Sequence, residues 1–135
     1  MRIVFDTNVL VSAFVARGAS FEVFEHCLST HDVFTSQHIQ EEVKTVLREK
    51  FLFPADEVSD VLEFLDSQLG SLDVRPLDTP VCRDADDDPV LACAVSAEAD
   101  CLISGDEDLL VPGEFKGTRI IKPSDFWNFE KNRLS

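Results

Sequence analysis

Acidic residues at separate places in the sequence have the types and spacing to form one metal-binding site. Asp6 directly follows the apolar run 3–5, and Asp106 follows a second apolar run at 102–103. A third acidic group precedes an apolar stretch and comprises Asp84, Asp86, Asp87 and Asp88. Ligand sets made only of oxygen suit Mg²⁺ or Mn²⁺. Two such ions can bind an RNA phosphate, generate a hydroxide nucleophile and stabilise the leaving oxygen, so the pattern indicates phosphodiester hydrolysis.

Helical geometry adds Glu42 as a fourth acidic position. With Ile39 at zero and about 100° per residue, Val43 and Leu47 share one apolar face with Ile39. On this scale Glu42 lies at about 300°, beside that face, and Glu41 at about 200°, almost opposite it. A carboxylate at the margin of a buried face needs a partner. We therefore expect Glu42 to point toward the protein and Glu41 toward solvent.

These carboxylates can act together only if the fold brings them to one place, because each alone would also suit a turn, a helix cap or a solvated helix position. The pattern predicts strands at 2–5, 32–35, 101–104 and 118–121, with a further short strand at 72–74. It predicts helices at about 8–16, from Ser20 past Leu28, and at 36–50, 54–69, 88–98, 106–110 and 124–127. We therefore predict one α/β domain over residues 1–135, with a central parallel sheet flanked by helices. Ligands of such sheets bind outside the carboxyl ends of the strands, where the acidic groups would meet.

The composition fits a single globular domain with an acidic surface. The chain has 135 residues and a net charge of −14, and its apolar fraction of 44% is enough for a core. Acidic residues stay in excess even without the candidate site acids, which disfavours a general nucleic-acid or anionic-membrane binder. RNA binding would then depend on the metal ions and a local basic patch. The candidates for that patch are Arg17, Lys44, Arg48 and Arg83.

Cysteine and histidine patterns give no metal motif. The four cysteines form no C-x-x-C pair, and the three histidines, His26, His31 and His38, do not complete a zinc spacing. We expect small buried thiols. Asp6 and Asn8 interrupt any apolar leader, and no apolar run approaches the roughly 20 residues of a membrane helix. We therefore expect a reduced, cytoplasmic protein that does not enter membranes.

In their order along the chain, four segments resemble the motifs of the PIN-domain family, in particular the VapC-like toxins of bacterial and archaeal toxin–antitoxin systems. The first is Ile3-Val4-Phe5-Asp6-Thr7-Asn8, continuing to Ala13. The second runs over 35–47 and contains Glu42, the third over 83–94 and contains Asp87, and the fourth over 99–110 and contains Asp106. Together they span nearly the whole chain.

The resemblance implies a ribonuclease that depends on Mg²⁺ or Mn²⁺ and acts on RNA. It also implies frequent homodimers and an antitoxin protein that inhibits by reaching into the acidic site. Asp6, Glu42, Asp87 and Asp106 would be the catalytic acids that hold metal, with Asp84 and Asp108 as further ligands or orienting groups. Thr7, Asn8 and Ser104 could hydrogen-bond to these carboxylates.

Two other functions remain open at this point. One is a different Mg²⁺-dependent phosphotransfer fold, such as a receiver domain or a phosphatase with an aspartyl nucleophile. Receiver domains usually pair acids at the end of the first strand, whereas Asp6 is followed by Thr7 and Asn8. The other is a PIN-like module that binds proteins and is catalytically silent. Intact acids at all four positions weigh against loss of the catalytic site.

Overall fold

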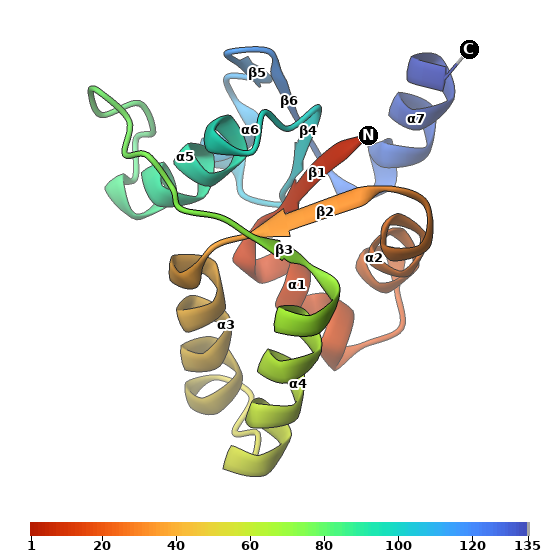
Figure 1. Ribbon diagram of the computed structural model, residues 1–135, viewed down its shortest axis with the longest axis vertical. Coiled ribbons are helices and arrows are strands. Elements are labelled where there is room, and N and C mark those ends of the chain that lie inside the picture. Colours follow the sequence, from red (N-terminus) through yellow and green to blue (C-terminus); the bar gives the residue numbers. More distant parts are fainter. Residues whose placement is uncertain (135) are drawn as a thin grey trace.

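The chain folds around a six-stranded sheet, seen in a computed structural model that describes residues 1–134 (Figure 1). The strands are β1 (Arg2–Phe5), β2 (Asp32–Thr35), β3 (Gly70–Ser71), β4 (Cys101–Ile103), β5 (Glu114–Phe115) and β6 (Thr118–Ile121). Their order across the sheet is β3-β2-β1-β4-β6-β5. All neighbouring strands are parallel except the antiparallel pair β5 and β6. The predicted α/β fold with a central parallel sheet is confirmed.

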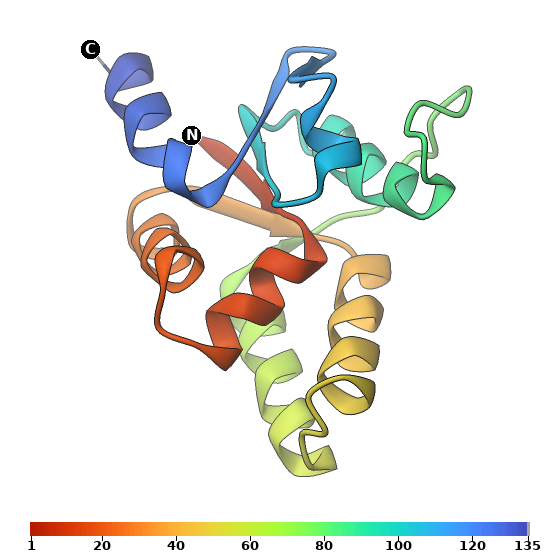
Figure 2. The ribbon, with the colours of Figure 1, turned by 180° about the vertical axis from the view of Figure 1, so that it is seen from behind.

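Helices lie on both sides of this sheet. They are α1 (Thr7–Val15), α2 (Ala19–Thr30), α3 (Gln37–Glu49), α4 (Ala55–Gln68), α5 (Asp88–Ser96), α6 (Glu107–Leu110) and α7 (Phe126–Leu134), with 3₁₀ turns at Ala85–Asp87 and Pro123–Asp125. Figures 1 and 2 show α1 to α4 gathered on one side of the sheet and α5 and α6 on the other. From β1 to β3 the chain crosses the sheet in one direction, and from β3 through β4 to β6 it crosses in the opposite direction. Because crossovers between parallel strands are right-handed, the helices of these two parts lie on opposite faces of the sheet.

The central strands are held by burial on both faces. Ile3, Val4 and Phe5 of β1 are at most 1% exposed, and all three residues of β4 are fully buried. Continuous apolar runs are typical of parallel strands covered by helices on both sides. The two strands that deliver acids to the candidate site are therefore also the most firmly embedded ones.

Helix α3 begins where the sequence predicts. Ser36 is its N-cap, and the Ser36 Oγ accepts a hydrogen bond of 3.2 Å from the Ile39 backbone N–H. Ile39, Val43 and Leu47 are fully buried. The cap and this apolar face together fix the rotation of the helix, which in turn fixes the direction of Glu42.

Other local predictions need correction. No strand forms at 72–74; β3 is Gly70–Ser71 instead, because the chain pairs with β2 directly after α4. The residues with which two helices were predicted to begin, Ser20 and Ser124, do not cap them. Ser20 lies inside α2, and Ser124 lies inside the 3₁₀ turn before α7. The last helix continues past Trp127 to Leu134.

Strand β5 was not predicted. It forms a hairpin with β6 through Lys116 and Gly117, which both have positive φ angles, of 48° and 85°. Two positive φ angles at the centre of a two-residue turn match the right-handed twist of a hairpin. Gly117 carries the only signal of this turn in the sequence, because glycine adopts positive φ at little cost.

The predicted thiol state agrees with the structure. Cys27, Cys82, Cys93 and Cys101 are all buried and unpaired with one another. Within the described part of the chain, the helices are too short or too polar to span a lipid bilayer.

Candidate metal site at the carboxyl edge of the sheet

Two strand ends lie side by side at the candidate site. Phe5 of β1 and Ile103 of β4 are register partners, and the Asp6 backbone N–H donates to the Ile103 carbonyl at 2.9 Å. The carboxylates gathered at this edge are called the acidic cluster: Asp6, Glu42, Asp84, Asp87, Asp106 and Asp108. Within it, Asp87, Asp106 and Asp108 each offer one oxygen, and these three oxygens lie within 4.8 Å of one another.

Asp6 is held rigidly at the floor of the cluster. Its residue surface is 5% exposed, and the fully buried Ser104 donates from Oγ to Asp6 Oδ2 at 2.8 Å. The same Ser104 Oγ accepts from the Asp106 backbone N–H at 3.0 Å. Burial raises the pKa of Asp6, and the charges of Asp106 and Glu42 raise it further, against the lowering effect of the Ser104 hydrogen bond.

Asp87 is a member of the cluster whose negative charge lacks stabilising hydrogen bonds at one oxygen. It occupies the N-cap position of α5, yet its side chain makes no capping hydrogen bond. Its Oδ2 atom is buried and has no hydrogen-bond partner in the described part of the chain. Burial raises the pKa of Asp87 to about 7, with additional contributions from the negative charges of Asp106, Asp6 and Asp84. A buried, unpaired carboxylate oxygen facing like charges is an arrangement that a bound cation would stabilise.

The adjacent Asp88 has a different task. Its Oδ1 accepts a hydrogen bond of 2.8 Å from the backbone N–H of Cys82. Partial burial would raise the pKa of Asp88, but the hydrogen bonds from Cys82 and Val81 outweigh it and lower the pKa. Asp88 therefore anchors the loop before the helix and leaves Asp87 to face the cluster.

Glu42 points toward the cluster as its helical phase predicts. Its Oε1 accepts a hydrogen bond of 2.7 Å from Thr7 Oγ1 and lies 3.3 Å from His38 Nε2. Glu41 is exposed and accepts instead from Gln37 Nε2 at 3.1 Å. His38 was not among the predicted site residues, although its position four residues before Glu42 is the spacing at which helical side chains meet.

The two outer acids differ in their partners. The Asp84 side chain is exposed and accepts from the Asp86 backbone N–H at 3.0 Å, which caps the short 3₁₀ turn. Asp108 pairs with Arg83 at 2.6 Å, and Arg83 is otherwise exposed. One oxygen of Asp108 also belongs to the close group with oxygens of Asp87 and Asp106.

Two of the three predicted supporting residues contact a carboxylate of the cluster. These are Thr7, which holds Glu42, and Ser104, which holds Asp6. Asn8 is exposed and lines a pocket of about 360 Å³ together with Asp106. Among residues 1–134 no hydrogen bond joins Asn8 to the cluster.

Only one of the four predicted basic residues lies at the cluster, namely Arg83. Arg17 follows the far end of α1, where it stacks over the Phe21 ring. Lys44 and Arg48 are exposed on α3 and line a separate pocket of about 340 Å³. Contact between RNA and these three residues stays a prediction and would require a substrate that extends beyond the cluster.

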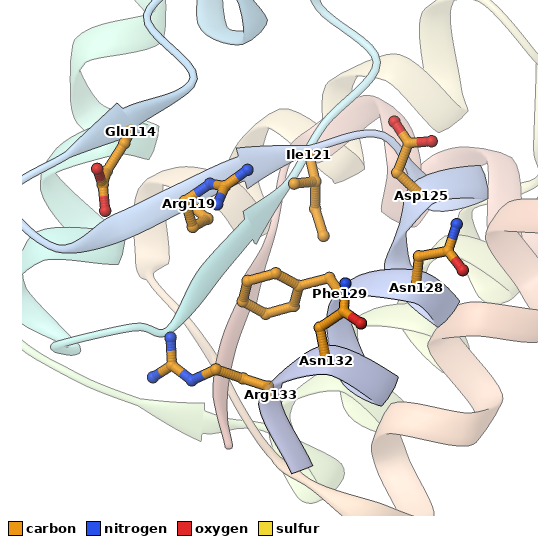
Figure 3. A pocket seen from close by; sticks show the side chains of 8 residues that line it. All are labelled: Glu114, Arg119, Ile121, Asp125, Asn128, Phe129, Asn132 and Arg133. Atoms are coloured by element: carbon orange, nitrogen blue, oxygen red, sulfur yellow. The ribbon is translucent and has the colours of Figure 1, made fainter. Parts of the chain in front are cut away.

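Two further pockets lie at separate places on the surface. One, of about 420 Å³, adjoins the cluster and is lined by His38, Asp88 and the proline-rich segment that includes Pro76 and Pro80. The other, of about 500 Å³, lies between β5, β6 and α7, with Arg119 and Arg133 in its wall (Figure 3). It contains no member of the acidic cluster, and Arg133 is paired with Asp100.

Comparisons with known proteins give a similar fold and a family. The fold is similar to the crystal structure of VapBC2 from Rickettsia felis bound to a DNA fragment from their promoter, with a TM-score of 0.65 and 12% sequence identity. The alignment covers 89% of this chain and 97% of that chain. No curated protein sequence matches. The PIN domain family matches residues 2–108, which include all six members of the acidic cluster. The chain therefore belongs to the PIN-domain family.

Proposed function

We propose that this protein is an endoribonuclease that depends on Mg²⁺ or Mn²⁺. The observation that carries the proposal is the buried, unpartnered Oδ2 of Asp87 beside the oxygens of Asp106 and Asp108. An all-oxygen ligand set with several carboxylates matches the preference of these two ions. Membership of the PIN-domain family supports the same conclusion.

Each acid has a proposed part in this reaction. Asp6, Glu42, Asp87 and Asp106 hold metal, while Asp84 and Asp108 serve as additional ligands or orienting groups. When bound, the metal supplies a hydroxide nucleophile and stabilises the charge on the leaving oxygen. Ser104 and Thr7 fix the directions of Asp6 and Glu42, so that little reorganisation is needed during the reaction.

We propose that metal binding at Asp87 depends on pH. Its pKa of about 7 means that a substantial fraction carries a proton near neutral pH when no cation is bound. A cation bound at this carboxylate displaces that proton, so metal binding should become tighter as pH rises. Asn8 lies in the pocket beside Asp106, where it can meet the substrate.

RNA binding is proposed to be weak and to depend little on salt. Arg83 at the cluster can contact a phosphate, and Arg17, Lys44 and Arg48 are available to a longer RNA. So few basic contacts release few counterions, which gives a shallow salt dependence.

We also propose that the protein is the toxin of a toxin–antitoxin pair and acts in the cytoplasm. The structural likeness to VapBC2 supports a protein partner, and the net charge of −14 favours a basic one. A homodimer is proposed as well. Phe51 and Leu52, in the turn between α3 and α4, are 45% and 80% exposed, and Phe64, in the second half of α4, is 40% exposed. These side chains provide apolar surface for such a contact.

The ribonuclease proposal is tested by replacing Asp6 with Asn. Wild type should cut RNA in Mn²⁺ and stop in EDTA, whereas Asp6→Asn should lose cleavage by about 100-fold or more, since even changes to outer-shell groups cost 10–100-fold. The melting temperature of the metal-free variant should be unchanged or higher, because the pKa of Asp6 is raised in the folded protein. Equal cleavage by both proteins would contradict the assignment. Metal binding without cleavage of any RNA would favour the protein-binding module.

Glu42→Gln and Glu41→Gln form a matched pair one residue apart. Glu42→Gln should reduce cleavage by about 100-fold, because it removes a charge that faces the cluster. Glu41→Gln should change cleavage less than about twofold, because Glu41 is exposed and accepts a hydrogen bond from Gln37 on the solvent side of α3. Initial rates on one labelled RNA at saturating Mn²⁺ give the comparison. The same loss in both variants would mean that Glu42 acts only through the general charge of the helix.

Asp87→Asn should change the pH dependence of stability in the absence of metal. The pKa of Asp87 is raised from 3.8 to about 7 on folding, so its contribution to wild-type stability is complete below pH 4 and is lost as pH rises through 7. The melting temperature of Asp87→Asn relative to wild type should therefore increase between pH 4 and pH 7 and then level off. Mn²⁺ at pH 7.5 should raise the wild-type melting temperature more than that of the variant. A difference that does not vary with pH would rule out Asp87 as the strained carboxylate.

A further inference from the structure

A second group of metal-ligand side chains lies at the opposite edge of the sheet. The Nε2 atoms of His26 and His31 lie 2.7 and 2.6 Å from the same atom, Oε2 of Glu130. One ligand atom from each residue falls within 4.8 Å of the others. These three residues are called the histidine–glutamate cluster. His31 caps the end of α2 immediately before β2, so the cluster lies at the amino ends of the strands, whereas Asp6 lies at the carboxyl end of β1.

The donor atoms of this cluster differ in kind from those of the acidic cluster. Two imidazole nitrogens and one carboxylate oxygen are the ligand set of many three-residue zinc sites, with a fourth position left for water. Imidazole suits Zn²⁺, Co²⁺, Ni²⁺ and Cu²⁺, and Mg²⁺ prefers oxygen alone. The two ring Nε2 atoms converge on Glu130 Oε2, and a metal ion bound there would require each ring to carry its proton on Nδ1.

The surroundings hold the three side chains in place and leave one side open. The side chains of His31 and Glu130 are 3% and 16% exposed, whereas that of His26 is 31% exposed. The fully buried Phe126 and the neighbouring Trp127 both pack against His26. Burial of Glu130 would raise its pKa, but hydrogen bonds from the two histidines outweigh it and lower the pKa. The carboxylate is therefore in its ionised form, which is the form that binds metal.

Metal binding requires the ligand atoms to move apart and the ring protons to change position. The ordinary zinc bond lengths of about 2.0–2.2 Å require ligand atoms roughly 3.4 Å apart in a tetrahedral site, so both contacts to Glu130 must lengthen. A metal on Nε2 of His31 also requires the ring proton to lie on Nδ1, which is 3.1 Å from the N-terminal ammonium nitrogen of Met1. That contact must change, because Nδ1 would then carry a proton facing the N-terminal ammonium group.

We propose that His26, His31 and Glu130 bind a Zn²⁺-type transition-metal ion, separately from the Mg²⁺ or Mn²⁺ of the acidic cluster. This site ties the end of α2 to α7, two segments about 100 residues apart in the sequence. It does not depend on the proposed ribonuclease activity. Its ligand chemistry would also keep it from taking up Mg²⁺.

Trp127 provides a local signal for the test. It is the only tryptophan of the chain, and its ring lies 4.9 Å from that of His26. Co²⁺ quenches tryptophan fluorescence at short range and absorbs visible light when bound by nitrogen ligands, whereas Zn²⁺ is silent and competes for the same ligands. Co²⁺ is therefore the probe, titrated in the presence of millimolar Mg²⁺ to occupy the acidic cluster.

Wild type should show Trp127 quenching that saturates at one equivalent of Co²⁺, with a visible absorption band that Zn²⁺ abolishes. His26→Gln and, as a second variant, Glu130→Gln should weaken the affinity by at least about tenfold. Asp106→Asn, which alters only the acidic cluster, should titrate like wild type. Circular dichroism melts in EDTA establish that each variant is folded before it is titrated.

Two results would overturn the proposal. One is the absence of saturable quenching in wild type, which would leave the cluster as a hydrogen-bonded tie between helices. The other is quenching that survives in both His26→Gln and Glu130→Gln but is lost in Asp106→Asn, which would place the Co²⁺ at the acidic cluster.

Discussion

Repulsion among carboxylates at the carboxyl edge of the sheet is the constraint on which the rest of the structure depends. The fold holds Asp6, Asp87 and Asp106 close together although their charges oppose one another. Buried strands β1 and β4 prevent the strand ends from separating, and the hydroxyl of Ser104 bridges them. The start of α5 also favours negative charge at Asp87. Even so, one oxygen of Asp87 has no partner in the described structure, and a divalent cation would supply the missing charge.

Much of this arrangement was predictable from the sequence because it follows from local periodicity. Apolar runs predicted the central strands, and the helical phase predicted the side of α3 on which Glu42 lies. Family resemblance, rather than geometry, selected Asp87 from four neighbouring aspartates. The structure separates Asp87 from Asp88, because the Asp88 carboxylate accepts a hydrogen bond from the backbone N–H of Cys82.

Features that depend on contacts between distant segments were not predictable in this way. Glu130 meets His31 across 99 positions, and no spacing rule connects residues so far apart. The positions of Lys44 and Arg48 were not predictable either, since these residues share a helix with Glu42 but line a pocket that contains no member of the acidic cluster. The two metal sites that we propose lie at opposite ends of the parallel strands. The ligands are all oxygen atoms at the carboxyl ends, and they are nitrogen and oxygen atoms at the amino ends.

The most direct test of the account is to locate Mn²⁺ in crystals of the protein by anomalous diffraction. The account predicts a peak bounded by the carboxylates of Asp6, Asp87 and Asp106. It also predicts that the peak is absent from crystals of Asp87→Asn. The contrary result is the absence of an anomalous peak at millimolar Mn²⁺ and pH 7.5, with all three carboxylates hydrogen-bonded to water or protein donors. That result would contradict the claim that a cation balances this cluster.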